Sequence, residues 1–433
     1  MDNLGEFDNI DIKNEDDLFV SAVQELPITS DEDGINLNGD KNLSEERDDF
    51  IDISIQESQK VGDGMGAYLA YKVITRTNIP IFKKKTMCVM RRFSDFLGLH
   101  DKLIEKYQRT GRIIPPAPEK SVIGMTKIKM SNQSETGSPT SSDFVERRKQ
   151  GLERYLRRTA KHPVLRVDPD FREFLESDME LPKATNTSAL SGAGVMRLFN
   201  KVGETVNKIA FKMDETDPWF EEKIQQIESL DVQLRKIHES VEMLVLNRRD
   251  LACYKSAFSK SAALLSNCEE HTNLSRALAQ LAEVKEKIES LHYEQANADF
   301  FILSETLKDY IGLLGAVKDA FHERTKVFQN WQHSQQMLSR RRESKAKLEL
   351  MGRSEKLEQA SSDVLDWESK VERGQQEFDN ISKMIKKEME SFEETRIQDF
   401  KRMFIKNLEA HMELQLKLVT YWEAFLPEAK AIV

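Results

Sequence analysis

The residues best suited to chemistry are cations that precede a predicted helix. Arg91 and Arg92 are followed by Phe93 and Ser94, where a predicted strand runs directly into a helix. An arginine side chain can donate two parallel hydrogen bonds to a phosphate, and the first amides of a helix also favour anions. Serine is a residue type that commonly starts helices. This segment is therefore a candidate phosphate-binding element.

Two more basic segments lie in the same part of the chain. Lys120 follows a proline-rich loop at residues 113–118, and Arg148 lies in a run of three basic residues on a predicted helix. One basic residue is usually a solvated surface charge, whereas three basic segments in one small domain favour an anion site. Residues 51–176 hold 24 basic and 15 acidic side chains. Charge alone does not distinguish nucleic acid from an anionic lipid surface.

Catalytic signatures are missing from the sequence. The eight histidines are scattered and none belongs to an HExxH pattern, and no GxSxG, P-loop or kinase signature occurs. The GDGMG segment at 62–66 lies between two predicted strands and opens no helix, which argues against a nucleotide site. Cys88, Cys253 and Cys268 form no CxxC pair. We therefore predict a non-enzymatic protein without a metal or other cofactor, from a reducing compartment such as the cytosol.

Length and composition indicate a water-soluble protein of two or three domains. The chain has 433 residues, of which 32% are charged and 39% hydrophobic. The longest apolar stretches, such as residues 300–303, are four residues long, and a membrane-spanning helix needs about 20. We expect neither a spanning helix nor a secretory signal.

The first 50 residues form a distinct acidic segment. They hold 16 acidic and three basic residues, few aromatics and no periodicity, so we expect residues 1–50 to be a disordered tail. Asp17, Leu18 and Phe19 interrupt it. Two interpretations stay open: chance hydrophobic residues, or a short peptide ligand in which acidic residues steer and Leu18 and Phe19 fill a pocket.

Residues 51–177 have the pattern of an α+β domain. Ile51, Ile53 and Ile55 alternate with polar residues, as in a half-buried strand. We predict three strands, beginning at 51 and covering 67–76 and 85–92, and three helices at 94–107, 143–161 and 169–175. A linker with small polar residues is expected at 178–189.

Residues 190–213 predict an amphipathic helix. Its apolar stripe consists of Phe199, Val202, Val206, Ile209 and Met213, and four basic residues flank that stripe.

The remaining residues, 214–433, predict very long helices, because no proline lies between Pro218 and Pro427. We expect helices at about 218–265, 274–350 and 355–425. The last would extend roughly 100 Å at 1.5 Å per residue, and it would need partners along its length. We therefore infer a three-helix bundle that dimerises. Near its second turn the sequence has a basic cluster: Arg340, Arg341, Arg342, Lys345, Lys347, Arg353 and Lys356.

These motifs resemble a known family. The segments 92–96 (RFSDF), 119–120 after the proline loop, and 146–148 ahead of 152–156 (LERYL) are similar to a phox-homology (PX) domain. The segments 190–194, 274–289, 293–301 and 421–432 resemble sorting nexins of the 1 and 2 type, in which a BAR domain follows the PX domain. The resemblance implies a PX domain at 51–177, with a three-stranded antiparallel sheet plus helices, and an all-α BAR domain at 214–433, a long antiparallel three-helix coiled-coil bundle that is dimeric.

The resemblance also implies roles for single residues. Arg92 would bind the 3-phosphate of phosphatidylinositol 3-phosphate, Phe93 would pack beside the inositol ring, and Ser94 would contact the head group. Lys120 would bind the 1-phosphate, and Arg148 would bind hydroxyls at the far side of the ring.

Other segments receive roles by the same resemblance. The loop side chains Val122, Ile123 and Met125 would dip into the membrane, although packing on the domain's own core is an equal alternative. Residues 190–213 would insert into the membrane as a wedge while the lysines stay at the phosphates, and the alternative is a stripe that packs on the BAR helices. The basic cluster would lie at a tip of the curved dimer, and residues 17–19 would recruit a FERM-domain sorting nexin.

The implied function is that of a peripheral adaptor on the cytoplasmic face of early endosomes. It would sense phosphatidylinositol 3-phosphate and curved anionic membrane, form homodimers and mixed dimers with other BAR-type sorting nexins, and drive tubule formation. Retrograde transport of cargo to the Golgi with the retromer trimer would follow, without nucleic acid as a partner. The alternative is a coiled-coil scaffold whose PX domain binds a protein instead of lipid.

Overall fold

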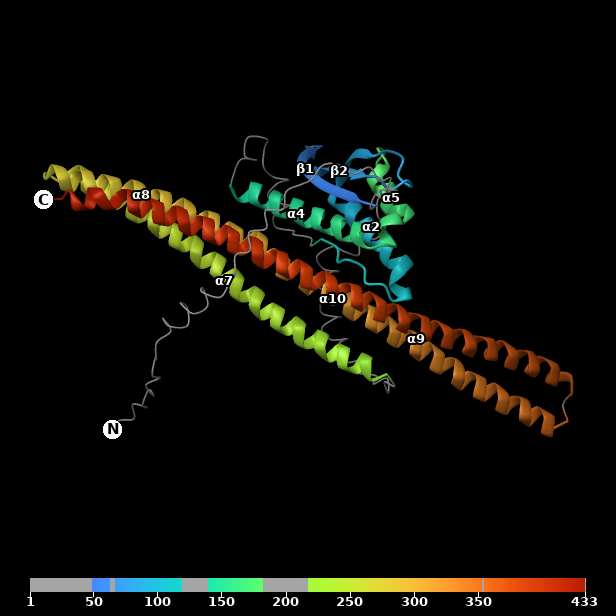
Figure 1. The fold of residues 1–433 in the computed structure, drawn as a ribbon. Coiled ribbons are helices and arrows are strands. Elements are labelled where there is room, and N and C mark those ends of the chain that lie inside the picture. Colours follow the sequence, from blue (N-terminus) through green and yellow to red (C-terminus); the bar gives the residue numbers. More distant parts are fainter. Residues whose placement is uncertain (1–48, 63–66, 119–138, 182–216, 353, 433) are drawn as a thin grey trace, which may run out of the picture. The chain divides into compact units, whose positions relative to one another are not determined.

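Three strands form an antiparallel sheet in the order β1-β2-β3 (Figure 1). They are β1 (Ile51–Val61), β2 (Tyr68–Thr77) and β3 (Thr86–Arg92). Ile53 and Ile55 are buried, as their spacing predicts. The computed structural model describes residues 49–62, 67–118, 139–181, 217–352 and 354–432, all of which belong to one unit, residues 49–433.

Three helices complete this sheet domain: α2 (Phe93–Tyr107), α4 (Pro139–Lys161) and α5 (Pro169–Glu176). Two short 3-10 turns, η2 (Gln108–Thr110) and η3 (Leu165–Val167), connect them to the rest. Helix α5 begins where its sequence predicts, because Asp168 accepts hydrogen bonds from two backbone amides of the first turn and proline follows it. Side chains from all three strands and all three helices share one apolar core.

Four long helices make up the C-terminal half: α7 (Pro218–Cys268), α8 (Thr272–Ala298), α9 (Glu305–Leu350) and α10 (Leu357–Lys430). They follow the predicted helices closely, with one difference. A π-helical turn, η5 (Asp299–Ser304), interrupts the predicted continuous helix 274–350. No helix among the described residues combines the length and the hydropathy that a bilayer crossing requires.

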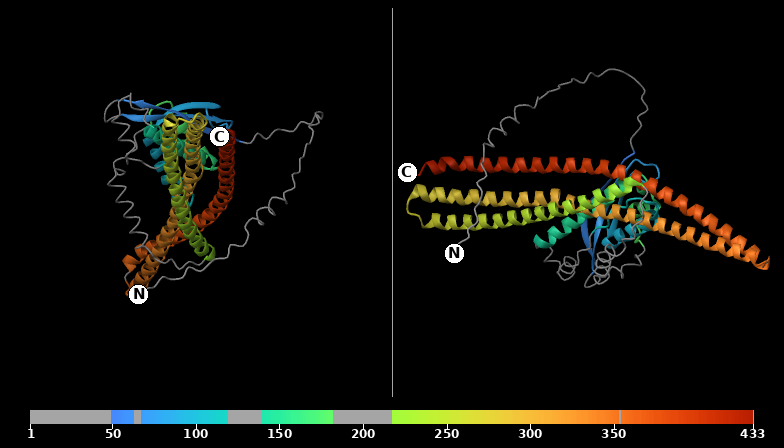
Figure 2. Two further views of the ribbon diagram at one scale, coloured as in Figure 1. Left: turned by 90° about the vertical axis from the view of Figure 1, so that its left-hand side faces the viewer. Right: turned by 90° about the horizontal axis from the view of Figure 1, so that it is seen from below.

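The long helices form two regions of one bundle. Helices α7, α8 and α10 lie side by side at one end, whereas α9 and α10 form an arm at the other (Figures 1 and 2). Helix α10 is bowed along its length (Figure 2). In the arm, Gly374 faces Trp331, and a Cβ at residue 374 would lie 3.2 Å from that ring. This close contact explains why residue 374 is a glycine.

The sheet domain packs directly on the bundle. Arg158 of α4 forms ion pairs with Asp309 of α9 and Asp399 of α10. Ile113 is buried in the core of the bundle, although it belongs to the loop after η2. Gly111, in the left-handed conformation with φ 84°, lies against Ile381 of α10. These contacts fix the base of the proline-rich loop on the long helices.

Candidate site at the start of helix α2

The two adjacent arginines of β3 have different environments. Successive side chains of a strand point to opposite faces, so Arg91 and Arg92 cannot act together. Arg91 is 2% exposed, and its Nε donates to the carbonyl of Phe174 at 2.9 Å. It also donates to the carbonyl of Ser177. Burial lowers the pKa of its guanidinium, and the nearby Asp95 partly offsets this. Arg91 therefore joins β3 to the end of α5 and does not face a ligand.

Arg92 is held in position by the first turn of α2. Its Nε donates to Oδ1 of Asp95 at 2.8 Å, and its backbone amide donates to Oδ2 of the same carboxylate at 3.0 Å. Among the described residues, the structure gives no hydrogen-bond partner to its two terminal nitrogens. A guanidinium clamped through Nε can present this pair of nitrogens to a phosphate. Phe93 and Ser94 follow as the first two residues of α2.

Arg148 of α4 lies over the start of α2. Its guanidinium is 4.5 Å from the ring centroid of Phe93 and 4.5 Å from that of Phe144. Burial lowers the pKa of Arg148, while the adjacent hydroxyl of Tyr71 favours its charged form. The structure thus brings Arg148 to the Arg92–Ser94 segment, as the resemblance implies, and places it between two aromatic rings.

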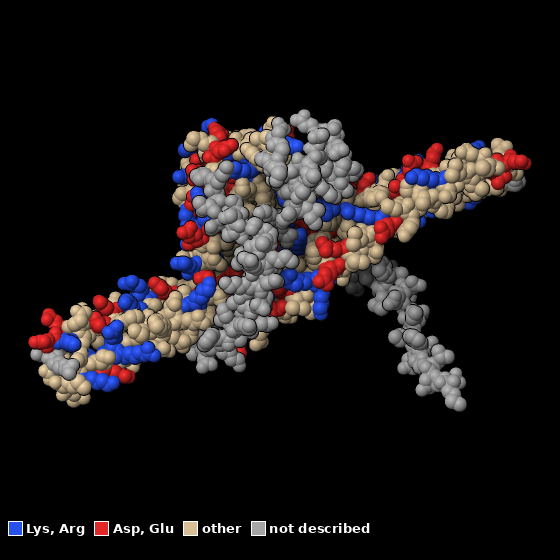
Figure 3. Space-filling model, turned by 180° about the vertical axis from the view of Figure 1, so that it is seen from behind, with Lys and Arg blue, Asp and Glu red and all other residues tan. Residues whose placement is uncertain are grey.

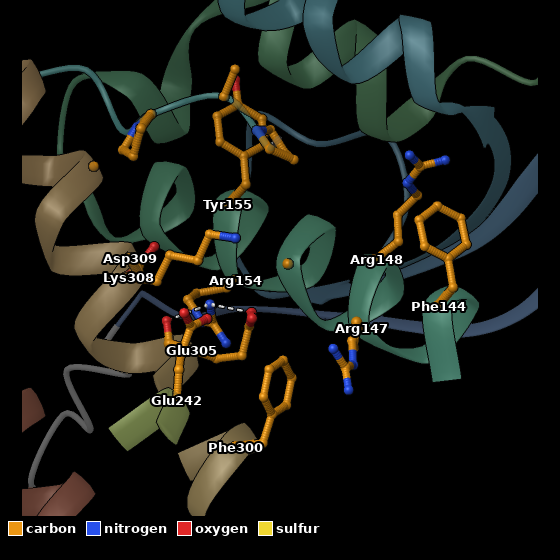
Figure 4. Close-up of a pocket in the computed structure, with 15 residues that line it drawn as sticks. Phe144, Arg147, Arg148, Arg154, Tyr155, Glu242, Phe300, Glu305, Lys308 and Asp309 are labelled. Atoms are coloured by element: carbon orange, nitrogen blue, oxygen red, sulfur yellow. Dashed lines mark hydrogen bonds and ion pairs between the residues drawn. The ribbon is translucent and has the colours of Figure 1, made fainter. Parts of the chain in front are cut away.

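Arg147 and Arg148 are neighbours in sequence but point in different directions (Figure 4). Arg147 turns towards the bundle, where its guanidinium lies 3.8 Å from the ring centroid of Phe300. In the same view Arg154 donates to the backbone carbonyl of Glu305 at 3.1 Å. A cavity lies between the sheet domain and the bundle. Its lining includes Arg148 from the sheet domain and Phe300 from the bundle.

The proline-rich loop forms one wall of this cavity. Pro116 lies against α9 at Gly312, where a Cβ would be 3.0 Å from the proline ring. The absence of a side chain at Gly312 therefore lets the loop pack closely against α9. Lys120, which follows the loop, lies outside the described residues.

Several other predicted site residues also lie outside the described part of the chain. They are Val122, Ile123 and Met125 of the loop; Phe199, Val202, Val206 and Ile209 of the predicted amphipathic helix; Asp17, Leu18 and Phe19 of the tail; and Arg353 of the basic cluster. Their roles stay predictions from the sequence.

The basic cluster lies at the end of α9 and the start of the next turn. Arg341 pairs with Asp363 at 3.2 Å, and Arg342 pairs with Glu368 at 2.7 Å, so α10 partly neutralises the cluster. Lys345 is 4.0 Å from Glu349. Arg340 and Lys347 are exposed and have no side-chain partner among the described residues. Fewer cations of this cluster are therefore available to an anionic ligand than the seven basic residues in the sequence indicate.

Helices α7 and α10 expose apolar stripes at helical spacing. On α10 the stripe includes Phe404, Leu408, Met412 and Leu416, each four residues after the last and 54% to 70% exposed. On α7, Tyr254, Phe258 and Leu265 are similarly exposed. An apolar stripe of this length on a water-facing helix is typical of a surface that another chain covers.

Sequence reasoning missed three residues that shape the site. Asp95 orients Arg92, Phe144 covers Arg148, and Tyr71 lies beside the same guanidinium. Asp95 had a local signal, because an acidic residue three positions after a helix cap commonly bonds back to it. Phe144 and Tyr71 had none, since their contacts depend on the packing of α4 on the sheet.

The fold and this site define a PX domain followed by a BAR-like helical domain. Comparison with protein families agrees: residues 79–178 match the PX domain, and residues 195–428 match the family described as "Vps5 C terminal like". The predicted fold class is therefore confirmed.

Two related proteins extend this assignment. Sorting nexin-2 of Bos taurus is 54% identical over 382 residues, which cover 88% of this chain and 73% of the relative. Sorting nexin-1 of Macaca fascicularis is 50% identical over 390 residues, which cover 90% and 74%. The chain belongs to the sorting nexin family, whose PX-BAR members are non-enzymatic trafficking adaptors.

A solved structure shows the same fold. It is described as "The cryo-EM structure of the SNX-BAR Mvp1 tetramer", is 20% identical, and has a TM-score of 0.53 over 86% of this chain and 99% of that chain. At this identity the likeness concerns the fold alone.

Proposed function

We propose that the chain is an endosomal sorting nexin that binds phosphatidylinositol 3-phosphate through its PX domain. The observation that carries this proposal is the meeting of Arg92 and Arg148 at the start of α2. The two residues come from different elements, and the guanidinium of Arg148 lies over the ring of Phe93, the residue that follows Arg92. A cationic fork, a helix start and an aromatic ring suit a phosphorylated cyclitol.

Each predicted contact has a chemical reason. The terminal nitrogens of Arg92 bind the 3-phosphate, because Asp95 occupies only Nε. Arg148 binds ring hydroxyls from its place between Phe93 and Phe144. Ser94 contacts the head group and Lys120 binds the 1-phosphate. Val122, Ile123 and Met125 then enter the lipid next to the captured head group.

The bundle supplies the second part of the function, which is the recognition of curvature. Helix α10 has 74 residues and so extends about 110 Å. Its exposed apolar stripe, with that of α7, is covered by a second chain, either identical or another BAR-type sorting nexin. The bowed dimer fits a curved anionic membrane, and the 190–213 helix inserts as a wedge while the basic cluster contacts lipid phosphates.

The cellular role follows from these properties. The protein works at the cytoplasmic face of early endosomes, where it forms tubules and returns cargo towards the Golgi with the retromer trimer. Residues 17–19 recruit a FERM-domain sorting nexin. Support for these partners comes from membership of the sorting nexin family and from the sequence motifs.

Substitution of Arg92 tests lipid recognition. We expect Arg92→Ala to weaken binding to phosphatidylinositol 3-phosphate vesicles by about a hundredfold, since a charge-assisted bidentate contact contributes up to about 3 kcal/mol. The affinity of Arg92→Lys should lie between those of the parent chain and Arg92→Ala, because lysine keeps the charge and loses the two parallel hydrogen bonds. Co-sedimentation of the full chain with phosphatidylcholine–phosphatidylserine vesicles, with and without the phosphoinositide, measures this.

Arg76→Ala is the matched control. Arg76 is exposed on the same sheet, and it lies opposite Thr86 while Arg92 lies opposite Ala70. The two arginines are therefore about 20 Å apart along the strands. Equal losses for Arg92→Ala and Arg76→Ala would show nonspecific charge attraction. Binding indifferent to the head group would favour the alternative, a scaffold whose PX domain binds protein.

A further inference from the structure

The last residue of α9 and the first residue of the turn after it expose two apolar side chains at the end of the arm. Leu350 is 90% exposed and Met351 is 66% exposed. Leu350 is the most exposed large hydrophobic side chain among the described residues. Unlike the stripes on α7 and α10, these two residues do not continue along a helix face. They cannot be explained by the helix pairing proposed for the dimer.

The backbone of this turn is fixed without them. The amide of Met351 donates to the carbonyl of Lys347 at 3.1 Å, and the amide of Gly352 donates to the carbonyl of Glu349 at 3.2 Å. Gly352 has φ 66°, the left-handed conformation that ends many helices. A Cβ at Gly352 would meet nothing within 4 Å. The backbone of residues 351 and 352 is therefore hydrogen-bonded to the last turn of α9, while both apolar side chains remain exposed.

Basic residues outnumber acidic ones in the sequence around the two apolar residues, although Glu349 and Glu355 lie among them and are exposed. Arg340, Lys347 and Lys356 are exposed and have no side-chain partner among the described residues, whereas Arg341 and Arg342 pair with α10. Seen from behind, the arm carries Lys and Arg among acidic residues, and residues of other types also lie at its extremity (Figure 3). Apolar side chains flanked by available cations match the depth profile of an anionic bilayer, in which phosphates lie outside the acyl chains.

We propose that Leu350 and Met351 form a second membrane wedge, which enters the boundary between head groups and acyl chains of an anionic bilayer. Arg340, Lys347 and Lys356 then contact lipid phosphates. This inference rests on the proposed function, because it needs a protein that already lies on membrane. A bilayer suits the turn better than a protein partner. A stable protein interface buries at least about 1,000 Å², and two side chains offer far less area than that.

The wedge is individually weak and gains strength from the assembly. A dimer would carry one turn at each end, and simultaneous engagement adds to head-group capture. We expect the double variant Leu350→Ser with Met351→Ser to bind anionic vesicles about tenfold more weakly than the parent chain, as the loss of two partly inserted side chains implies. Both residues are exposed, so the thermal midpoint should not change.

Leu365→Ser provides the matched control for this variant. Leu365 is also an apolar residue, 65% exposed, but it lies within α10, about 12 Å along the helix from its start. We expect its loss to leave vesicle binding unchanged. An equal loss in both variants would overturn the assignment of the wedge to the turn.

A fluorescent label gives the direct test of insertion. Cys88, Cys253 and Cys268 are exposed and would be replaced by serine, after which Met351→Cys carries an environment-sensitive nitrobenzoxadiazole group. We expect its emission to shift to the blue on phosphatidylcholine–phosphatidylserine vesicles that contain phosphatidylinositol 3-phosphate. The same label at Gln336, which is exposed on α9 about 21 Å from the turn, should stay in water.

The outcomes separate the wedge from the proposed function. If the chain floats with the vesicles while the label at 351 stays in water, the wedge is wrong and lipid binding stands. If the chain does not float, both are wrong. If the label shifts with rising protein concentration before any vesicle is added, a second copy covers the turn and the lipid assignment is overturned.

Discussion

At the scale of single residues, the site depends on the different directions taken by the two members of each pair of adjacent arginines. Arg91 is buried and donates to the end of α5, whereas Arg92 bonds Asp95 through Nε and keeps its terminal nitrogens for a ligand. On α4, Arg147 reaches Phe300 of the bundle and Arg148 reaches Phe93 at the start of α2. Chemical identity alone did not distinguish the members of either pair. Strand alternation decides the first pair and the packing of α4 decides the second.

A buried histidine gives the sheet domain a measurable pH dependence. Burial lowers the pKa of His100 from 6.5 to about 4, although the carbonyl of Pro115 favours the protonated ring. The unfolded chain therefore binds a proton near pH 6.5, whereas the folded chain does so only near pH 4. Stability falls as the pH decreases through this window, by at most about 3 kcal/mol.

Comparison with His100→Gln would measure this contribution. We expect the free energy of unfolding of the parent chain to fall more steeply than that of the variant between about pH 6.5 and pH 4. Thermal denaturation at a series of pH values, followed by circular dichroism, reports the difference. Parallel pH profiles would contradict the assignment of a neutral buried His100.

At the scale of elements, the turn after η2 joins the sheet domain to α10. A Cβ on Gly111 would lie 2.8 Å from a side-chain carbon of Ile381 and 3.0 Å from its carbonyl oxygen. Gly111→Ala should therefore lower the free energy of unfolding by about 1–3 kcal/mol, from left-handed strain and from the clash. Chemical denaturation of the full chain measures the loss.

Gly62→Ala separates these two causes. Gly62 also has a positive φ, 76°, but the nearest atom to a Cβ there is 3.9 Å away. This control includes the backbone strain and lacks the clash. If Gly111→Ala costs no more than Gly62→Ala, the close packing of this turn on α10 is wrong.

The elements themselves were largely predictable from the sequence. Isoleucine alternation predicted β1, and the gap between Pro218 and Pro427 predicted the long helices. The π-helical turn η5 was missed, because its residues have ordinary helical spacing and the extra residue per turn leaves no signal there. Ile113 was also unpredictable as a core residue of the bundle, since the proline loop that carries it resembles a surface segment.

The site was less predictable than the fold. The basic residues could be recognised individually, but the meeting of Arg148 with Phe93 was expected only from the family resemblance. Its physical cause is the packing of α4 against β1, where Glu153 accepts from the amide of Ile55 at 2.8 Å and Arg157 donates to the carbonyl of Ile53 at 2.7 Å. No sequence period encodes a contact of this kind.

At the scale of the whole molecule, the proposed function assigns lipid chemistry to the sheet domain and membrane shape to the helical bundle. Arg158 links α4 to both α9 and α10, so the candidate site at the start of α2 belongs to a domain that is tied to the long helices. No single contact has to be strong, because head-group capture and curved-surface fit act on one membrane. We therefore expect each signal to raise the apparent affinity for the other.

The most direct measurement is flotation of the full chain with vesicles of two diameters, each prepared with and without phosphatidylinositol 3-phosphate. We expect the strongest binding to small vesicles that carry the phosphoinositide, and a larger effect of diameter when that lipid is present. Equal binding to all four preparations would contradict the account.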